Sequence, residues 1–125
     1  ADVILCKAEI ENALNGPGAA LPYINEVRAR AGAPEYGSSA EFPIPASKEG
    51  MIDVLIDERG YELVFEYHRR ADLIRLGKYV EICNAYLVER GMSPIVTENL
   101  RYFPYPLDEV MINDQMAAEN ASRIP

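Results

Sequence analysis

The fold is decided by the stretch ERGYELVFEYHRRADLIRLGK, from Glu58 to Lys78, in which charged residues are interspersed with apolar ones. Together with MIDVLID, which precedes it, this stretch predicts one long helix or two nearly continuous helices. Ser47 is the expected N-cap, and Gly77 is the expected end of the helical region. Gly60 and residues 67–68 are the positions at which we expect a bend. The functional question is whether these charges hold a fold together or act on a ligand.

Three carboxylates of this stretch recur every four residues, at Glu58, Glu62 and Glu66, and therefore follow one stripe of a helix. Like charges in such a stripe repel one another unless cations lie nearby. The expected pairs are Glu62 with Arg59, Glu66 with Arg69 and Arg70, and Asp72 with Arg69 and Arg75. We interpret them as an ion-pair lattice that holds helices in register. Replacing Glu66 or Arg69 with alanine is then expected to lower stability by about 1 to 3 kcal/mol.

No pattern in the sequence predicts a metal site or a catalytic centre. His68 is the one histidine, and Phe65 stands three positions before it, so the Glu-x-x-His unit of carboxylate-bridged metal sites is absent. The acidic residues contain no motif that selects a glycosidase pair. His68 is also not accompanied by a G-x-S-x-G or papain-like cysteine signature. We therefore expect no catalytic residues, no metal ligands and no cofactor.

Length and composition are those of one globular domain, and we expect residues 1–125 to form a single domain. Acidic residues outnumber Lys and Arg by 20 to 12, which gives a formal net charge of -8. This charge disfavours nucleic acids and anionic membrane surfaces, because phosphate binding needs clustered cations. Neutral ligands and proteins remain open as partners. We find no apolar run long enough to span a membrane and expect no signal peptide or anchor.

A pair of helices is predicted at the amino end. ADVILCKAEIENALNG predicts a first helix that stops at Gly16, and a second helix is expected from about Leu21 or Pro22 to Ala31. The short GPGAA connection makes them antiparallel. The first helix carries an apolar stripe that calls for a packing partner: Val3, Cys6, Ile10, Ala13 and Leu14.

The remaining segments predict a loop, a helix and a strap. Residues 33–46 are too rich in Pro, Gly and Ser for regular structure. A helix is expected from Lys78 to Arg90, and an extended Pro-rich strap that follows it turns into a short helix near Pro106 or Leu107. No strong strand pattern is present, so the predicted class is all-α with little or no β.

Two features remain open on the residues alone. Tyr36 and Phe42 lie in the predicted loop, where an exposed ring can contact a sugar, although ordinary packing explains them equally. Cys6 and Cys83 are interpreted as buried thiols, with one disulfide as the alternative.

Four segments, taken in order, resemble one known family. They are AEIENALNG, INEVRARAGAP, IDERGYELVFEYHRRADLIRLGK and YFPYPLDEVMINDQM, and together they extend from about Asp2 to about Asn120. Their order and spacing resemble the carboxy-terminal part of the SusD/RagB family. A resemblance over nearly the whole chain is more specific than any single short motif.

The resemblance implies a fold and a function. The implied fold is an all-α superhelix with a tetratricopeptide-like helix pair, long helices and an extended Pro-rich carboxy-terminal strap. Members of the family are outward-facing, lipid-anchored proteins of the outer membrane. They are not enzymes, and they bind oligosaccharides or other nutrients and deliver them to a SusC-like TonB-dependent transporter. The chain would then be a carboxy-terminal fragment, with the lipidated cysteine elsewhere in the parent protein rather than at Cys6.

In the family, the pattern ER..EL.FE.HR..DLIR.GK reads as a scaffold signature, in keeping with the ion-pair interpretation. It corresponds here to Glu58, Arg59, Glu62, Leu63, Phe65, Glu66, His68, Arg69, Asp72, Leu73, Arg75, Gly77 and Lys78. The sequence departs from the family at Arg70 and Ala71, where an aromatic pair is common. It also has Glu119, Asn120, Ala121 and Ser122 in place of a Gln-Asn-Pro-Gly-Tyr ending. Neither the resemblance nor the residues identify ligand-binding positions.

The competing hypothesis is a stand-alone tetratricopeptide-like module that binds a peptide or partner protein. A carbohydrate-active enzyme is a third and weaker hypothesis. If the chain is a fragment, we expect apolar surface on its first helix pair to be exposed.

Overall fold

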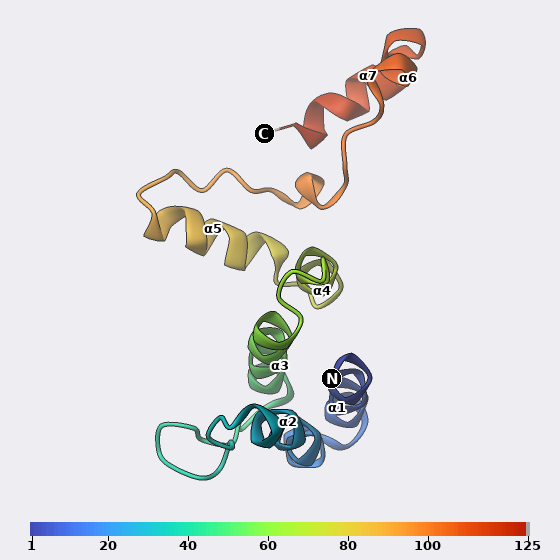
Figure 1. The fold of residues 1–125 in the computed structure, drawn as a ribbon. Coiled ribbons are helices and arrows are strands. Elements are labelled where there is room, and N and C mark those ends of the chain that lie inside the picture. Colours follow the sequence, from blue (N-terminus) through green and yellow to red (C-terminus); the bar gives the residue numbers. More distant parts are fainter. Residues whose placement is uncertain (125) are drawn as a thin grey trace. The chain divides into compact units, whose positions relative to one another are not determined.

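The computed structural model describes residues 1–124, and its regular structure is helical (Figure 1). The α-helices are α1 (Asp2–Asn15), α2 (Pro17–Ala31), α3 (Lys48–Glu62), α4 (Arg69–Arg75), α5 (Tyr79–Glu89), α6 (Leu107–Ile112) and α7 (Asp114–Asn120). Two short 3-10 turns, η1 (Glu98–Arg101) and η2 (Ala121–Arg123), complete the regular structure. Within residues 1–124, β pairing is limited to an isolated bridge between Ser39 and Phe42. The predicted all-α class is therefore confirmed.

The chain divides into two compact units, Ala1–Asp72 and a second unit that starts at Leu73. Helix α4 spans this division. The prediction of a single domain stays a prediction, and each unit is described separately.

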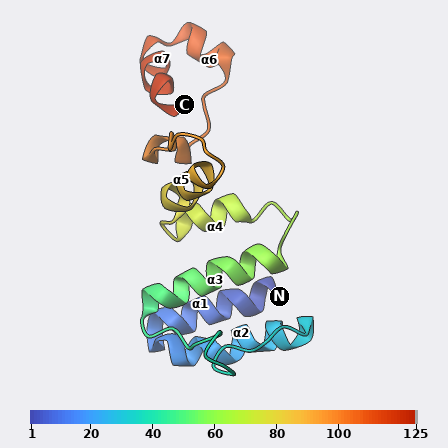
Figure 2. The same cartoon turned by 90° about the vertical axis from the view of Figure 1, so that its left-hand side faces the viewer.

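Helices α1 and α2 form the predicted antiparallel pair, but they are joined by one residue (Figure 2). Gly16 ends α1 and caps α2 with a φ of 91°, a value that favours glycine because a Cβ would be strained there. Pro17 takes the first helical turn, where its missing N–H leaves no bond unmade. The predicted start of the second helix at Leu21 or Pro22 is therefore wrong, since α2 begins at Pro17.

The core of the first unit lies between α1, α2 and α3, which lie side by side in Figure 2. It consists of Leu5, Ala8, Ala20, Ile24, Val27, Met51 and Leu55. On α1 the buried row is Leu5, Ala8 and Asn12. The predicted stripe does not face this core, because its large members Val3, Ile10 and Leu14 are 57 to 80% exposed. These three side chains form the exposed apolar surface that was expected on the first helix pair.

Helix α3 begins as predicted, with the Ser47 hydroxyl accepting a hydrogen bond from the Gly50 amide at 3.0 Å. It ends at Glu62, and residues 63–68 form a turn before α4. The bend near residues 67–68 is thus confirmed. Gly60 does not end the helix, since α3 continues to Glu62. Its missing side chain leaves room for Arg69 to lie against the helix, because an ideal Cβ at Gly60 would lie 2.8 Å from Nη1 of Arg69. That guanidinium crosses Gly60 to donate to the Ile56 carbonyl.

The second unit follows the predicted order. Helix α5 matches the expected helix to within one residue at each end, and Gly91 follows it with a φ of 72°. Helix α6 begins where a short helix was expected, whereas α7 was not predicted. The segment between α5 and η1 is tied to α5 because the Asn84 amide both donates to and accepts from the Val96 backbone at 2.9 Å.

Candidate functional site

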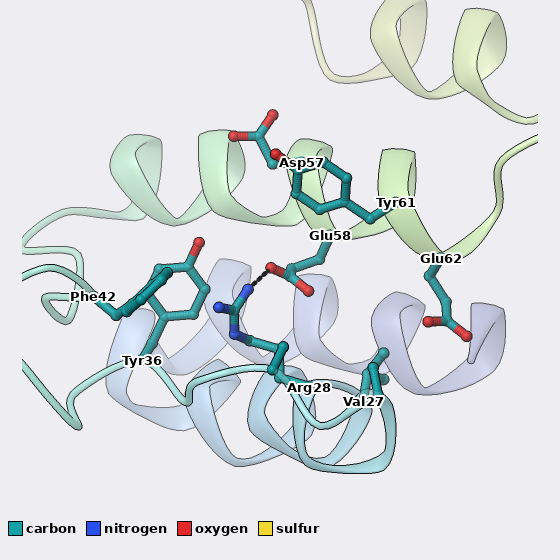
Figure 3. Close-up of a pocket in the computed structure, with 10 residues that line it drawn as sticks. Val27, Arg28, Tyr36, Phe42, Asp57, Glu58, Tyr61 and Glu62 are labelled. Atoms are coloured by element: carbon teal, nitrogen blue, oxygen red, sulfur yellow. Dashed lines mark hydrogen bonds and ion pairs between the residues drawn. The ribbon is translucent and has the colours of Figure 1, made fainter.

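A pocket of about 430 Å³ opens in the first unit between α2, the loop after it and α3 (Figure 3). We call it the Arg28 pocket, and its lining residues are Val27, Arg28, Ala31, Ala33, Tyr36, Phe42, Asp57, Glu58, Tyr61 and Glu62. Three structural elements therefore contribute side chains to one concave surface.

A buried ion pair forms the inner wall of the Arg28 pocket. The Arg28 guanidinium donates to the Glu58 carboxylate, and both side chains are less than 10% exposed (Figure 3). Arg28 Nε also donates to the Pro34 carbonyl at 2.5 Å, so one side chain links α2, the loop and α3. Burial raises the pKa of the Glu58 carboxyl, although the Arg28 charge opposes this shift. Removing either partner would leave a charge buried without compensation.

The loop aromatics form a second wall. The rings of Tyr36 and Phe42 meet edge to face, with centroids 5.9 Å apart. The Arg28 guanidinium lies 4.6 Å and 4.9 Å from these two centroids, within the range of cation–π attraction. The loop is held by Asn25, whose side chain donates to the Tyr36 carbonyl and accepts from its amide. Both rings are half-buried, and burial raises the pKa of the Tyr36 hydroxyl.

The outer rim of the Arg28 pocket comes from α3. Asp57 and Tyr61, both labelled in Figure 3, are exposed, and Tyr61 is 74% exposed. Glu62 forms an ion pair with Arg30 of α2. The pocket thus offers an exposed ring and carboxylate oxygens that accept hydrogen bonds, which suits a ligand with both apolar faces and hydroxyl groups.

The structure brings together other charges than the sequence predicted. Arg59 is buried and joins two carboxylates, with Nε 2.8 Å from Asp72 and Nη2 2.7 Å from Asp2. Burial lowers the pKa of Arg59, but the hydrogen bonds to Asp72 and Asp2 outweigh it and raise the pKa overall. Glu62 pairs with Arg30 rather than with Arg59. Arg59 and Glu62 thus form their ion pairs with other helices and not with each other.

Glu66 lies beyond the end of α3, so the prediction that it continues the helical stripe of Glu58 and Glu62 is wrong. It is exposed in the turn after α3, and within residues 1–124 it forms no ion pair, so the predicted pairs with Arg69 and Arg70 are wrong. The stripe continues only as far as Glu62 because α3 ends there. His68 is half-buried in the same turn.

The side chains that could hold a metal ion or form a disulfide are not arranged to do so in the described part of the chain. No group of three or more His, Cys, Asp or Glu side chains there is arranged to hold a metal ion. Cys6 and Cys83 are both half-buried, and no disulfide joins them.

Sequence reasoning did not single out Arg28 or Tyr61 as site residues. Arg28 follows the buried Val27 and lies four positions after the buried Ile24, so it is a cation on the apolar face of α2. That placement was a usable signal, because an arginine on such a face needs a buried partner. Tyr61 gave no signal, since its role depends on how the loop folds against α3.

The chain belongs to the SusD family, which it matches over residues 1–121. It is 37% identical to SusD-like protein P25 of Formosa agariphila, in an alignment that covers 98% of this chain and 23% of the relative. It is 31% identical to SusD-like protein P2 of the same organism, covering 96% of this chain and 24% of that relative. The chain therefore spans about a quarter of the length of these relatives. No solved structure matches the chain.

Proposed function

We propose that this chain is the carboxy-terminal portion of a nutrient-binding protein of the outer membrane, which binds an oligosaccharide and delivers it to a SusC-like TonB-dependent transporter. The observation that carries the proposal is the match to the SusD family over residues 1–121. The protein is proposed to bind rather than to catalyse, in line with the family.

The ion pairs support a scaffold role for the signature stretch. Arg28 and Glu58 connect α2 to α3, while Arg59 connects α3 to Asp2 of α1 and Asp72 of α4. Such pairs fix the relative positions of helices, because a buried charge is stable only when its partner stays in place. A rigid scaffold is what a binding surface requires.

The location follows from the same proposal. None of the helices in residues 1–124 combines the length and apolar character that crossing a membrane requires. We propose that a lipid group attached elsewhere in the parent protein holds it at the cell surface. The coding DNA upstream of Ala1 tests this, since the proposal requires an in-frame signal peptide followed by a lipidation cysteine.

The function is tested on the complete coding product. We expect it to bind at least one oligosaccharide in a panel of glycans and to co-purify with a transporter that is encoded beside it. A turnover assay on the same panel should detect no product. Glycan cleavage, or co-purification with an unrelated protein in place of a transporter, would contradict the proposal.

The antiparallel pair α1 and α2 is the observation that favours the alternative, a stand-alone tetratricopeptide-like interaction module. The two hypotheses differ in the gene: the module requires no signal peptide upstream and no transporter gene alongside.

A further inference from the structure

One asparagine of the chain combines an exposed side chain with a glycine directly after it. Asn15 is the last residue of α1, and Gly16 follows it. A larger residue follows each of the other asparagines: Asn12, Asn25, Asn84, Asn99, Asn113 and Asn120. Because glycine has no Cβ, it leaves the backbone nitrogen free to approach the preceding side chain and the backbone free to take the required conformation. Asn15 is therefore the asparagine whose sequence context most favours deamidation.

Deamidation at such a pair needs no enzyme. The backbone nitrogen of Gly16 attacks the side-chain carbonyl carbon, Cγ, of Asn15. A carbon–nitrogen bond forms, the bond from Cγ to the amide nitrogen breaks, and ammonia leaves with the proton that the Gly16 nitrogen gives up. Water then opens the resulting succinimide ring at either of its carbonyls. The products are aspartate and isoaspartate, and in isoaspartate the main chain runs through the side-chain carbon and is one methylene longer.

The folded state restrains this reaction at Asn15. The Gly16 amide donates to the carbonyls of Asn12 and Glu11, at 3.0 and 3.2 Å, so its nitrogen is held at the end of the helix. The side-chain amide of Asn15 is also held, because it donates to the Glu11 carboxylate at 2.7 Å. All of these contacts lie in the last turn of α1, and helix ends fray more readily than helix interiors. The reaction therefore requires local opening of this turn but no global unfolding.

The products place unfavourable groups at the end of α1. A carboxylate at position 15 lies at the negative end of the helix dipole. It also lies beside the Glu11 carboxylate, so that a hydrogen bond is replaced by repulsion between like charges. Isoaspartate in addition lengthens the main chain next to Gly16, the residue that connects α1 and α2. Both products therefore weaken the pairing of the two helices.

We propose that Asn15 is a site of spontaneous deamidation, gated by opening of the last turn of α1, and that its products loosen the junction between α1 and α2. The reaction consumes water and releases ammonia. Molecules that have reacted carry an added negative charge at this junction, so the stability of the protein falls with its age. The site does not depend on what the parent protein binds, and the failure of either proposal leaves the other intact.

Peptide mapping of the complete coding product by mass spectrometry tests the site. The protein is incubated at mildly alkaline pH, and conversion of amide to acid is followed at each asparagine. Asn15 should react at least about tenfold faster than Asn99, an exposed asparagine that precedes Leu100 and serves as the internal control. Isoaspartate should appear beside aspartate, because only the cyclic route produces it. Equal rates at Asn15 and Asn99, or aspartate without isoaspartate, would refute the site.

Urea tests the gate. Unfolding removes the hydrogen bonds of the Gly16 amide, so the rate at Asn15 should rise at least about tenfold. A tenfold rise corresponds to a free energy of about 1.4 kcal/mol for local opening. A rate at Asn15 that is the same in the folded and the unfolded protein would refute the gate.

Asn15→Asp tests the consequence for the junction, because it reproduces one of the products. Its melting temperature at neutral pH should lie below that of the unmodified protein, and the difference should shrink in acid, where carboxylates are neutral. Asn15→Gln is the matched control, since it keeps an amide at this position and should melt as the unmodified protein does. Equal melting temperatures for Asn15→Asp and Asn15→Gln at neutral pH would refute the loosening of the junction.

Discussion

The two units of the chain differ in the interactions that stabilise each of them internally. Apart from Leu73, every buried apolar side chain in residues 1–124 belongs to the first unit. That unit combines an apolar core with the buried pairs of Arg28 and Arg59. The second unit contains α5, which buries no residue, and several large apolar side chains that are mostly exposed, such as Phe103 and Ile112.

In the second unit, hydrogen bonds between polar side chains and backbone groups fix segments that no apolar core covers. Asn84 forms two hydrogen bonds with the Val96 backbone, and the Asn120 side chain accepts from the Tyr105 amide at 2.6 Å. Arg123 donates to the Phe103 carbonyl and to the Tyr105 hydroxyl. The comparison teaches that a Pro-rich strap, which cannot form a ladder of its own, is fixed by individual side chains.

The largest effect is expected when a buried charge of the first unit loses its partner. Arg59→Ala removes the guanidinium whose Nε lies 2.8 Å from the buried Asp72 carboxylate, and it should lower the free energy of unfolding by about 3 to 5 kcal/mol. Denaturant unfolding measures this. Arg30→Ala is the matched control, because that arginine is 65% exposed and its pair with Glu62 should contribute about 0 to 1 kcal/mol. Equal losses for the two variants would show that burial of the pair does not matter.

In the second unit, the expected change is smaller and local. Asn84→Ala removes both hydrogen bonds to Val96 and should cost about 1 to 3 kcal/mol. Hydrogen exchange at the Val96 amide should accelerate. Asn25→Ala removes the equivalent pair of bonds to Tyr36 in the unit that has a core, so it is the matched variant there. If Asn25→Ala lost more protection from hydrogen exchange around Tyr36 than Asn84→Ala lost around Val96, the second unit would not depend more on such side chains than the first.

The pH dependence of the first unit should include a contribution from Asp2. The hydrogen bond from Arg59 lowers the pKa of the Asp2 carboxyl below its ordinary value of 3.8. A lowered pKa stabilises the folded state above that ordinary value, and the stabilisation is lost as the pH falls through the lowered pKa. Asp2→Asn should therefore be less stable than the parent at neutral pH, and the difference should shrink below about pH 4. A difference that grows in acid would contradict this assignment.

The smallest effect is expected at Glu66. Its side chain is exposed in the turn after α3, so Glu66→Ala should change stability by less than about 0.5 kcal/mol. This replaces the loss of about 1 to 3 kcal/mol that the stripe pattern predicted. Thermal unfolding of Glu66→Ala, measured in parallel with Arg59→Ala and the unmodified protein, checks this expectation. A loss as large as that of Arg59→Ala would mean that Glu66 has a partner in the folded protein.

Much of the fold could be predicted because its signals are local. Ser47 as an N-cap, Gly16 and Gly91 as helix ends and the start of α6 are set by the chemistry of single residues and their immediate neighbours. The start of α2 was misplaced because two prolines compete for the first turn and either fits it locally. Which face of α1 is buried depends on the packing of α2 and α3, which periodicity does not encode.

The candidate site was less accessible to prediction. Tyr36 and Phe42 were singled out because they are aromatic residues in a loop, and the structure places both in the wall of the Arg28 pocket. Arg28 and Tyr61 contribute to that pocket only because the loop folds back between α2 and α3. Ion pairs between helices are likewise invisible in the sequence, where spacing indicates partners within one helix alone.

The one-residue connection at Gly16 has a consequence for the order of folding. The entropy lost on closing a loop grows with the length of the loop. Because Gly16 alone connects α1 and α2, bringing the two helices together costs little conformational entropy beyond that of forming each helix. Contacts between neighbouring segments also form faster than distant ones. We therefore expect this hairpin to be the nucleus onto which α3 docks, with the 33–46 loop closing afterwards over the Arg28 pocket.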